Sequence, residues 1–433
     1  MAWRLLLLLV AARAAEPWTR APASVAGAAG KLAQPSVRPP VYTVDLALPA
    51  EQRWAHIAEA YRSKVPDIVA YFEAVVPRWA MPLVEAVGAR MGGYFHLYGG
   101  EMAGLAEALG ASPGLIVLMN LVYQLEGLGL NCSTWNVTGP TRKDDPGCVD
   151  VDPGQEWSYC HSAHAAGAMQ SHDGFTYLSR KLDEADGPGM CTSIVAQATD
   201  GTIIHGRNLD WNLPAVMRSL VVDVDFVNTS KSADTLFRMT TAVGFVGGFN
   251  GMAYRGRGGD GWSVTIDARG KGGKPLDNLL QALRVHSLTP CQHLRHVLER
   301  TSDFEQGISA LSTTPLIDEM YYIVAGTKAA EGAVVTRGRE KAVDVWRLNP
   351  SEPDGWFRLQ TNYDHWNPVP AADDRRNPGI AMMKATGQAG LSTASMWHVI
   401  TSFPVFNHHT DISLIAMPQK QIFNVTVWMG GEH

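Results

Sequence analysis

The segment that decides the fold is "GPGMCTSIVAQATDGTIIHGRNLDW", which runs from Gly187 to Trp211. It contains two alternating runs rich in β-branched residues, the pattern of half-buried strands. Between the runs lies an Asp-Gly dipeptide, which favours a tight hairpin because such turns need positive φ angles. The first run starts at Cys191, so the sequence predicts a β-hairpin with a cysteine at the head of its first strand.

The register of this hairpin decides which side chains lie beside the cysteine. If the Asp-Gly pair alone forms the loop, facing positions sum to a constant and Cys191 faces Asp210. Directly opposed residues have Cβ atoms about 4.5–5.5 Å apart. Arg207 would then point to the opposite face, and a bulge near Gly206 would be required to bring both charges to the cysteine. The alternative is a structural ion pair between Arg207 and Asp210 at the strand end.

Composition and charge limit the kinds of function. The chain has 433 residues, of which 46% are hydrophobic and 18% charged, with a net charge of −6. These values are typical of a folded protein, and the length predicts two or three domains or one long fold. The acidic balance and the lack of a long Lys/Arg cluster argue against nucleic acid as a partner. The Gly-rich basic stretches lack P-loop spacing, and His161 and His164 lack the paired ligands of a zinc site, so no cofactor or metal is expected.

The first residues predict a secretory signal peptide over residues 1–14. Arg4 precedes an apolar run, and Ala12 and Ala14 provide a small-residue cleavage site. A membrane anchor is the alternative, but a span needs ~20 apolar residues and no run in the sequence reaches that length. We therefore expect a soluble product of the secretory pathway.

Sequons and cysteines agree with that compartment. Four Asn-x-Ser/Thr tripeptides predict glycosylation, at Asn131, Asn136, Asn228 and Asn424. The five cysteines are an odd number, so at least one thiol stays unpaired or pairs between chains. Cys148 and Cys160 enclose a short Pro/Gly loop and are expected to form a disulfide, with Cys132 as a competitor.

The rest of the chain divides by sequence pattern. The segments are a flexible leader (15–40), a helical region (41–126), a surface insert (127–190) and a strand-rich region (191–433). Aromatic residues of the helical region, such as Tyr71, Phe72 and Trp79, belong either to the core or to a lipid-facing surface. Many antiparallel strands with helices grouped around them predict an α+β sandwich.

From Cys191 onward the sequence resembles a known family. The segments that carry the resemblance are "CTSIVAQ", "HGRNLD", "TPLIDEMYYIVAGT", "TNYDHW" and "DDRR" followed by "TGQA". They resemble the acid amidases and ceramidases in the cholylglycine hydrolase branch of the N-terminal nucleophile (Ntn) hydrolases. "VAQ", "HGRNLD" and "TGQA" are more similar to the N-acylethanolamine-hydrolysing acid amidases than to the ceramidases. The resemblance extends more loosely over residues 41–126.

This resemblance implies a fold and a maturation step. The implied fold is an Ntn-hydrolase αββα sandwich of two antiparallel sheets between helical layers, with a helical N-terminal region. The implied step is self-cleavage between Met190 and Cys191, which makes the cysteine the first residue of a second chain. Its thiol attacks the amide carbonyl and forms a thioester, while its own α-amine handles the proton. The two chains, α and β, then form a heterodimer.

The resemblance also implies roles for residues around the cysteine. Asp210 would orient the α-amine, and Arg207 would favour the thiolate through its positive charge. Asn362 in "TNYDHW" would stabilise the oxyanion, and Arg375 in "DDRR" would be a second active-site arginine. Asp267 is expected to contact substrate. For Arg375 the alternative is a solvated run of charges.

Two features depart from the family pattern. The family reaches its nucleophile in few residues after the last helix, whereas here residues 127–190 intervene. That insert could slow cleavage, cover the site or be trimmed away. In addition, Asp267-Ala268-Arg269 stands where the family usually has Asn/Asp-Glu-Arg.

The resemblance therefore implies hydrolysis of N-acylethanolamines to fatty acid and ethanolamine at acidic pH. The expected partners are a lipid amide substrate and a membrane surface on which the protein rests peripherally. Two alternatives stay open: a ceramidase or other lipid- or bile-type amide hydrolase on the same fold, and a catalytically silent, secreted lipid-binding relative.

Overall fold

The computed structural model describes most of the chain outside the N-terminus and the insert. The described residues are 35–75, 97–126, 190–270 and 288–430, apart from 212, 257, 258, 371 and 372, together with 82, 86, 88, 148, 149, 159, 160 and 281. The expected signal peptide, most of the leader and insert, and the sequons at Asn131 and Asn136 lie outside these residues.

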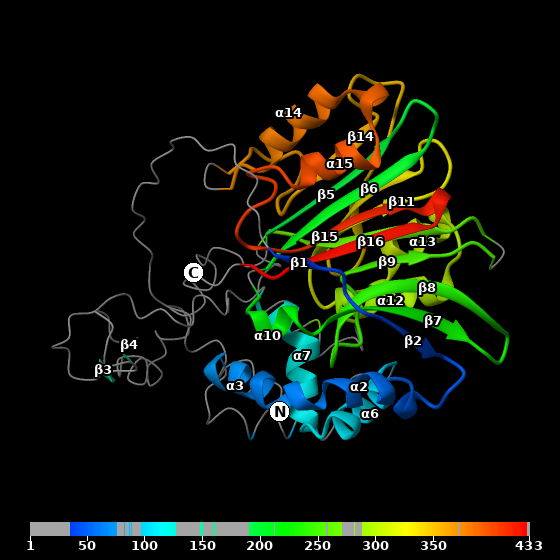
Figure 1. The fold of residues 1–433 in the computed structure, drawn as a ribbon. Helices are drawn as coiled ribbons and strands as arrows, with labels where there is room; N and C mark the ends of the chain where they lie inside the picture. The colour runs from blue at the N-terminus through cyan, green and yellow to red at the C-terminus, as the bar shows by residue number, and fades with distance from the viewer. Residues whose placement is uncertain are drawn as a thin grey trace.

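The first sheet contains the cysteine strand. Its order is β1 (Ser36–Val37), β16 (Ile422–Trp428), β15 (Thr410–Met417), β6 (Ile203–Asp210), β5 (Met190–Gln197) and β14 (Phe357–Gln360). All neighbouring pairs in this six-stranded sheet are antiparallel. The strand headed by the cysteine, β5, therefore lies between two others, as Figure 1 shows.

The second sheet packs against the first and has eight strands. Its order is β13 (Ala342–Arg347), β12 (Gly332–Arg337), β11 (Met320–Ala325), β10 (Trp262–Ala268), β9 (Asn250–Ala253), β8 (Ser232–Ala242), β7 (Val221–Asn228) and β2 (Val41–Asp45). Strand β2 runs parallel to β7, so the expectation of two purely antiparallel sheets is wrong at this edge. The physical reason is that β2 reaches β7 through a long connection, and only a tight hairpin would force antiparallel pairing.

Helices cover both outer faces of the two sheets (Figure 1). The helices on the eight-stranded sheet are α12 (Pro290–Arg300) and α13 (Phe304–Thr313), and those on the six-stranded sheet are α14 (Arg376–Thr386) and α15 (Thr393–Ile400). Helix α12 begins with a capping box in which the Thr289 side chain accepts from the backbone N–H of Gln292. The predicted αββα sandwich is confirmed.

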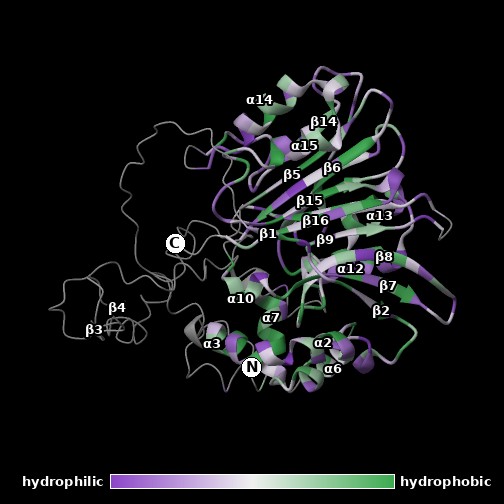
Figure 2. Ribbon diagram, viewed as in Figure 1, coloured by the Kyte–Doolittle hydropathy of each residue, from purple (hydrophilic) through white to green (hydrophobic). Residues whose placement is uncertain are grey.

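The region before the insert is helical after its first strand. Its helices are η1 (Ala50–Gln52), α2 (Ala55–Tyr61), η2 (Arg62–Lys64), α3 (Val65–Val75), α6 (Gly99–Leu109) and α7 (Pro113–Glu126). Helix α6 ends at Gly110, whose φ of +66° gives the left-handed C-terminal cap that glycine favours. Helix α7 is mostly hydrophobic (Figure 2) and is buried from Gly114 to Leu121, as its all-round apolar sequence predicts.

Short elements complete the description. They are α10 (Ala215–Arg218), η4 (Gln388–Gly390), η5 (Pro418–Lys420), β3 (Cys148–Val149) and β4 (Tyr159–Cys160). Among the aromatic residues of the helical region, Phe72 is buried in the core and Tyr71 is half-buried, whereas Trp79 lies outside the described residues. In the part of the chain that the structure describes, no helix combines the length and apolarity that a membrane crossing requires.

The segment that precedes Cys191 contributes an edge strand to each sheet. Strand β1 pairs with β16, and β2 pairs with β7. From the sequence these residues were expected to be the end of a leader and the start of a helical region, so neither strand was predicted. The N-terminal segment is therefore part of the sandwich and not only a layer that covers it.

A buried ion pair also joins the two parts of the chain. The Glu101 carboxylate accepts two hydrogen bonds from Arg295, at 2.6 and 2.7 Å. Glu101 also accepts from Arg53 at 2.8 Å and from the Trp54 indole at 2.5 Å. The Arg295 guanidinium lies 4.3 Å from the centre of the Tyr98 ring, a cation–π contact. Removing one partner would leave the other charge buried and unpaired, which costs about 3–5 kcal/mol.

Candidate active site

The predicted hairpin forms, but its register differs by one residue from the expected one. Strand β5 pairs with β6 so that Met190 lies opposite Asp210 and Cys191 lies opposite Leu209. The prediction that Cys191 faces Asp210 is therefore wrong. The cysteine does head the strand, because only Met190 precedes it in β5.

The loop of the hairpin explains the shift. It has three residues and not two, because the backbone N–H of Ala198 donates to the carbonyl of Thr202 at 2.9 Å. The N–H of Gly201 donates to the Ala198 carbonyl at 3.0 Å, and Gly201 has a φ of +85°. A turn followed by a left-handed glycine is the usual three-residue hairpin loop.

The observed register places Arg207 on the same face as the cysteine. Arg207 lies opposite Ser193, which is two residues from Cys191, so no bulge between β5 and β6 is needed. The Arg207 Nη2 atom lies 3.7 Å from the Cys191 thiol. The bulge proposed near Gly206 is absent from this strand pair, and the ion pair of Arg207 in the structure is with Asp267.

Cys191 itself is fully buried between the sheets. Its backbone N–H donates to Oδ1 of Asn362 at 2.7 Å. Burial and the charge of Asp267 raise the pKa of its thiol to about 11, although Arg207 acts in the opposite direction. In the uncut chain the thiol is therefore protonated.

Asn362 contacts the cysteine through its amide oxygen. Oδ1 accepts from the Cys191 N–H and from Nη2 of Arg375 at 2.8 Å, while Nδ2 donates to the Ala268 carbonyl at 2.9 Å. Both partners of Oδ1 are donors, so the network requires this orientation of the amide. The structure thus brings Asn362 to the nucleophile, and its role as an oxyanion donor stays a prediction.

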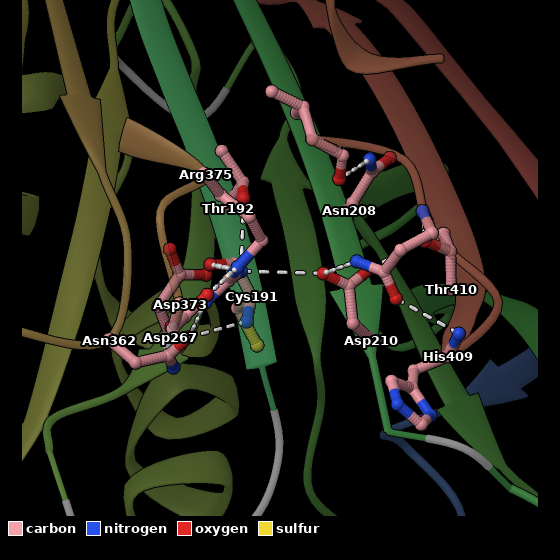
Figure 3. Close-up of polar contacts among 12 residues, drawn as sticks. Cys191, Thr192, Asn208, Asp210, Asp267, Asn362, Asp373, Arg375, His409 and Thr410 are labelled. Carbon is pink, nitrogen blue, oxygen red and sulfur yellow. Dashed lines mark hydrogen bonds and ion pairs between the residues drawn. The ribbon is translucent and has the colours of Figure 1, made fainter. Parts of the chain in front are cut away.

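Arg375 links the nucleophile to Asp210 (Figure 3). Its Nη1 atom donates to the Cys191 carbonyl at 2.5 Å and to the Thr192 hydroxyl at 3.1 Å, and lies 3.4 Å from Oδ2 of Asp210. Its remaining face forms two hydrogen bonds with Asp373, at 2.6 and 2.8 Å. Arg375 is buried, so the interpretation of "DDRR" as a solvated run of charges is wrong for this residue.

Asp210 lies beside the junction between Met190 and Cys191. Its carboxylate accepts from Thr410 at 2.7 Å and from Asn407 at 3.3 Å, and it faces Arg375. Burial raises its pKa to about 6, and the Arg375 charge opposes that rise. Thr410 and Asn407 were not predicted from the sequence, and neither was Asp373, for which the "DDRR" motif offered a signal.

Asp267 lies on the other side of the cysteine. It accepts from the Ser193 hydroxyl at 2.8 Å and lies 3.8 Å from Nε of Arg207. Burial raises its pKa to about 7, with Arg207 opposing. Arg207 in turn donates to Asn250 at 2.5 Å and to the Ile266 carbonyl at 2.7 Å. Nothing in the sequence identified Asn250 as part of this network.

The remaining predicted residues lie away from this site. His205 hydrogen-bonds with Ser263 and Thr265, so both of its ring nitrogens have partners. Asn228 is partly exposed and Asn424 is exposed, and their glycosylation stays a prediction. Cys148 lies opposite Cys160 in the β3–β4 pair, and the disulfide between them stays a prediction. Within the described residues, no group of three or more His, Cys, Asp or Glu side chains could hold a metal ion.

Fold and site together define a class of protein. A two-sheet sandwich with helices on both outer faces, and a buried cysteine heading an inner strand beside two arginines, is the arrangement of the Ntn hydrolases.

Comparisons with known proteins narrow the class. The family model described as the beta subunit of N-acylethanolamine-hydrolyzing acid amidase matches residues 37–96, which precede Cys191. N-acylethanolamine-hydrolyzing acid amidase of Rattus norvegicus is 40% identical over 254 residues, which cover 56% of this chain and 67% of that protein. Acid ceramidase of Mus musculus is 26% identical over 414 residues, which cover 90% of this chain and 86% of that protein. The solved structure of the Caenorhabditis elegans N-acylethanolamine-hydrolyzing acid amidase ortholog matches with 32% identity and a TM-score of 0.47, over 53% of this chain and 93% of that chain.

The chain belongs to the family of N-acylethanolamine-hydrolysing acid amidases, which is related to the acid ceramidases, and is an amide-hydrolysing enzyme. The family model is named for one subunit, which indicates a two-chain processed form.

Proposed function

We propose that this chain is a self-processing cysteine amidase that hydrolyses N-acylethanolamines to fatty acid and ethanolamine at acidic pH. The observation that carries the proposal is the position of Cys191, at the head of β5 with its N–H on Asn362 and its thiol beside Arg207. The 40% identity with an amidase of that name supports the choice of substrate class.

The proposed maturation uses the thiol against the preceding peptide bond. The Cys191 sulfur attacks the Met190 carbonyl carbon, the acyl group moves from nitrogen to sulfur, and the α-amine is released. Water then hydrolyses the thioester, which frees the Met190 carboxylate and restores the thiol. Arg375, which donates to the Cys191 carbonyl, would hold the residue in place during these steps.

In the mature site the proposed reaction repeats this chemistry on a lipid amide. The thiol gives its proton to the α-amine of the same residue, attacks the substrate carbonyl and releases ethanolamine, and water hydrolyses the acyl thioester. Arg207 and Arg375 would stabilise the thiolate. We also propose that the enzyme works in the lysosome or after secretion, that it is glycosylated, and that it rests peripherally on a lipid surface.

The substrate test compares two head groups. We expect a saturated long-chain N-acylethanolamine to be hydrolysed with a higher kcat/KM than the matching ceramide, in the same micelles at acidic pH. The reason is the greater sequence similarity to the amidases over spans of nearly equal length, 40% over 254 residues against 29% over 253 residues with an acid ceramidase. A ceramide preference in the same measurement would move the chain to the ceramidase alternative and leave the Cys191 chemistry intact. Hydrolysis of neither lipid, by a chain that has cut itself, would point to another amide.

A second test concerns the acidic pH. In the proposed reaction the Cys191 thiol passes its proton to the α-amine of the same residue. The amount of thiolate therefore depends on how nearby charges change the pKa values of these two groups. Burial raises the pKa of Asp267 to about 7, so this carboxyl is neutral in acid and becomes negative as the pH rises through 7. Its negative charge raises the pKa of the Cys191 thiol. The activity should therefore fall as the pH rises through about 7.

The variant Asp267→Asn mimics the neutral carboxyl and can still accept from Ser193. We expect its kcat/KM, measured from pH 4 to 8.5, to lose the decline near pH 7 that the natural enzyme shows. The shape of the profile is the readout, because a change at a substrate contact can also lower the overall rate. A variant that keeps the natural decline would show that another group sets it.

A further inference from the structure

The loop between β8 and β9, residues 243–249, lies beside the site and is buried along its whole length. Buried backbone groups need hydrogen-bond partners. Four N–H groups of this loop find backbone acceptors, in the pairs Val243–Leu220, Phe245–Ala242, Gly248–Cys291 and Phe249–Thr240. The buried backbone groups in the middle of the loop need hydrogen-bond partners of another kind. Thr241 donates to the Phe245 and Gly247 carbonyls, and Arg295 donates to the Val246 carbonyl.

Asn120 supplies two further partners from helix α7. Its Nδ2 atom donates to the Gly244 carbonyl at 2.8 Å, and its Oδ1 atom accepts from the Val246 N–H at 2.9 Å. Nδ2 also donates to the Ile116 carbonyl of its own helix at 2.8 Å. Asn120 is fully buried, and its amide offers a donor and an acceptor at these two positions.

The C-terminal end of the same loop holds the active-site arginine. Nη1 of Arg207 donates to Oδ1 of Asn250 at 2.5 Å and lies 3.5 Å from the Phe249 carbonyl. The other terminal nitrogen, Nη2, is the one beside the Cys191 thiol. The loop therefore holds one side of this guanidinium, while the Ile266 carbonyl of β10 accepts from Nη2 at 2.7 Å on the other.

Helix α7 packs closely against the loop, so the position of the helix restricts that of the loop. Gly244 has a φ of +93°, and a Cβ atom there would lie 2.6 Å from the Met119 sulfur of α7. The rings of Phe245 and Phe249 stack at 5.3 Å, which couples the two halves of the loop. The loop therefore packs directly against α7 on the side of Gly244.

We propose that Asn120 is a positioning residue for the nucleophile: through the β8–β9 loop it holds the Arg207 guanidinium beside the Cys191 thiol. Asn120 precedes the junction at Met190, so after the proposed cut it belongs to the first chain while Arg207 belongs to the second. The second chain alone therefore has an incomplete site. The inference rests on the proposed function only in taking Cys191 as the nucleophile.

Two variants test the inference in the full chain, Asn120→Leu and Asn120→Asp. Leucine removes both contacts with the loop. We expect it to lower kcat about tenfold or more with KM within about twofold, and to raise the pKa of the Cys191 thiol by about one unit, since a cation within about 4–6 Å lowers a thiol pKa by roughly 1–3 units. That pKa is measured by titrating the absorbance of the Cys191 thiolate, with the absorbance of the Cys191→Ala variant subtracted. This measurement needs neither substrate nor a reagent that has to reach the buried thiol.

The aspartate variant supplies a pH-dependent rescue. A protonated carboxyl can donate to the Gly244 carbonyl and accept from Val246, whereas a carboxylate can only accept. We expect the kcat of Asn120→Asp to approach that of the natural enzyme as the pH falls. As the pH rises, its kcat should fall more steeply than that of the natural enzyme. The charged pair nearest the loop is Arg295, which donates to the Val246 carbonyl at 3.0 Å, and Glu101. Burial raises the pKa of Glu101, but Arg295 and the hydrogen bonds hold it below its usual value, so this pair keeps its charges between pH 5 and 8.

The matched control is Leu109→Ala, at the end of α6 in the same buried N-terminal region. It should lower the melting temperature and leave the thiol titration unchanged. If both Asn120 variants keep the thiol pKa and the kcat of the natural enzyme, the inference is overturned, whatever their stability. If Asn120→Leu does not fold, the test rests on Asn120→Asp at low pH, where the protonated carboxyl has nearly the same shape as the natural amide. Failure to hydrolyse N-acylethanolamines together with a shifted thiol pKa would remove the proposed substrate and keep Asn120 as a positioning residue.

Discussion

Cys191→Ala leaves one uncut chain at acidic pH and abolishes amide hydrolysis. The reason is that both proposed reactions use the same sulfur, first against the Met190 carbonyl and then against the substrate. Intact mass after acid incubation measures the cut, and release of ethanolamine measures the hydrolysis. Loss of the nucleophile should reduce hydrolysis to background, the largest effect that we expect from any single substitution.

The matched control is Cys291→Ala. Cys291 is the other free cysteine among the described residues, and it is buried as deeply as Cys191. This variant should be cut between Met190 and Cys191 and should hydrolyse substrate. If Cys191→Ala were cut as efficiently as the natural chain, an external protease would be responsible and self-processing would be wrong.

Asn362→Ala should lower kcat by on the order of a hundredfold or more, with little change in KM. A side-chain donor in an oxyanion hole is typically worth about 10²–10³ in rate. In the uncut chain the Asn362 oxygen accepts from the Cys191 N–H, so the amide is already beside the reacting atoms. Single-turnover kinetics separate this loss from slower product release.

Asn362→Asp distinguishes two ways in which this residue could act. A carboxylate can still accept from Cys191 and Arg375 but has no N–H to donate. If Asn362 acts as an oxyanion donor, the aspartate variant is as slow as the alanine variant. Near-natural turnover in Asn362→Asp would instead assign it to holding the amine of Cys191, and near-natural turnover in both would remove it from the mechanism.

Local signals in the sequence were sufficient to predict the hairpin and its cysteine, but not its register. A two-residue and a three-residue loop both place Gly201 in a left-handed conformation, so the glycine alone does not distinguish them. The error of one position exchanged the faces of all residues of β6 relative to Cys191. It made Asp210 the expected neighbour of the thiol, when the neighbour is Arg207.

Contacts between residues far apart in the sequence could not be predicted, for a different reason. Arg375 was found through the family resemblance, but its partner Asp373 was not, although it lies two residues away. Asn120 stands in an apolar helix where nothing in the local pattern shows which loop it faces. Strand β2 was hidden because its five residues precede a long helical pattern, and its partner β7 follows much later in the sequence.

The strands β1 and β2 set the working life of the enzyme once the proposed cut is made. In the uncut chain both edge strands are tethered to the sheets that they complete, and refolding is a reaction within one molecule. After the cut, a molecule that unfolds releases its N-terminal chain, and reassembly then needs an encounter between two molecules. At low concentration that encounter is slow compared with proteolysis or aggregation, so each unfolding event removes an enzyme permanently. The lifetime of the mature protein is therefore governed by how slowly the two chains come apart, and not by an equilibrium between folded and unfolded forms.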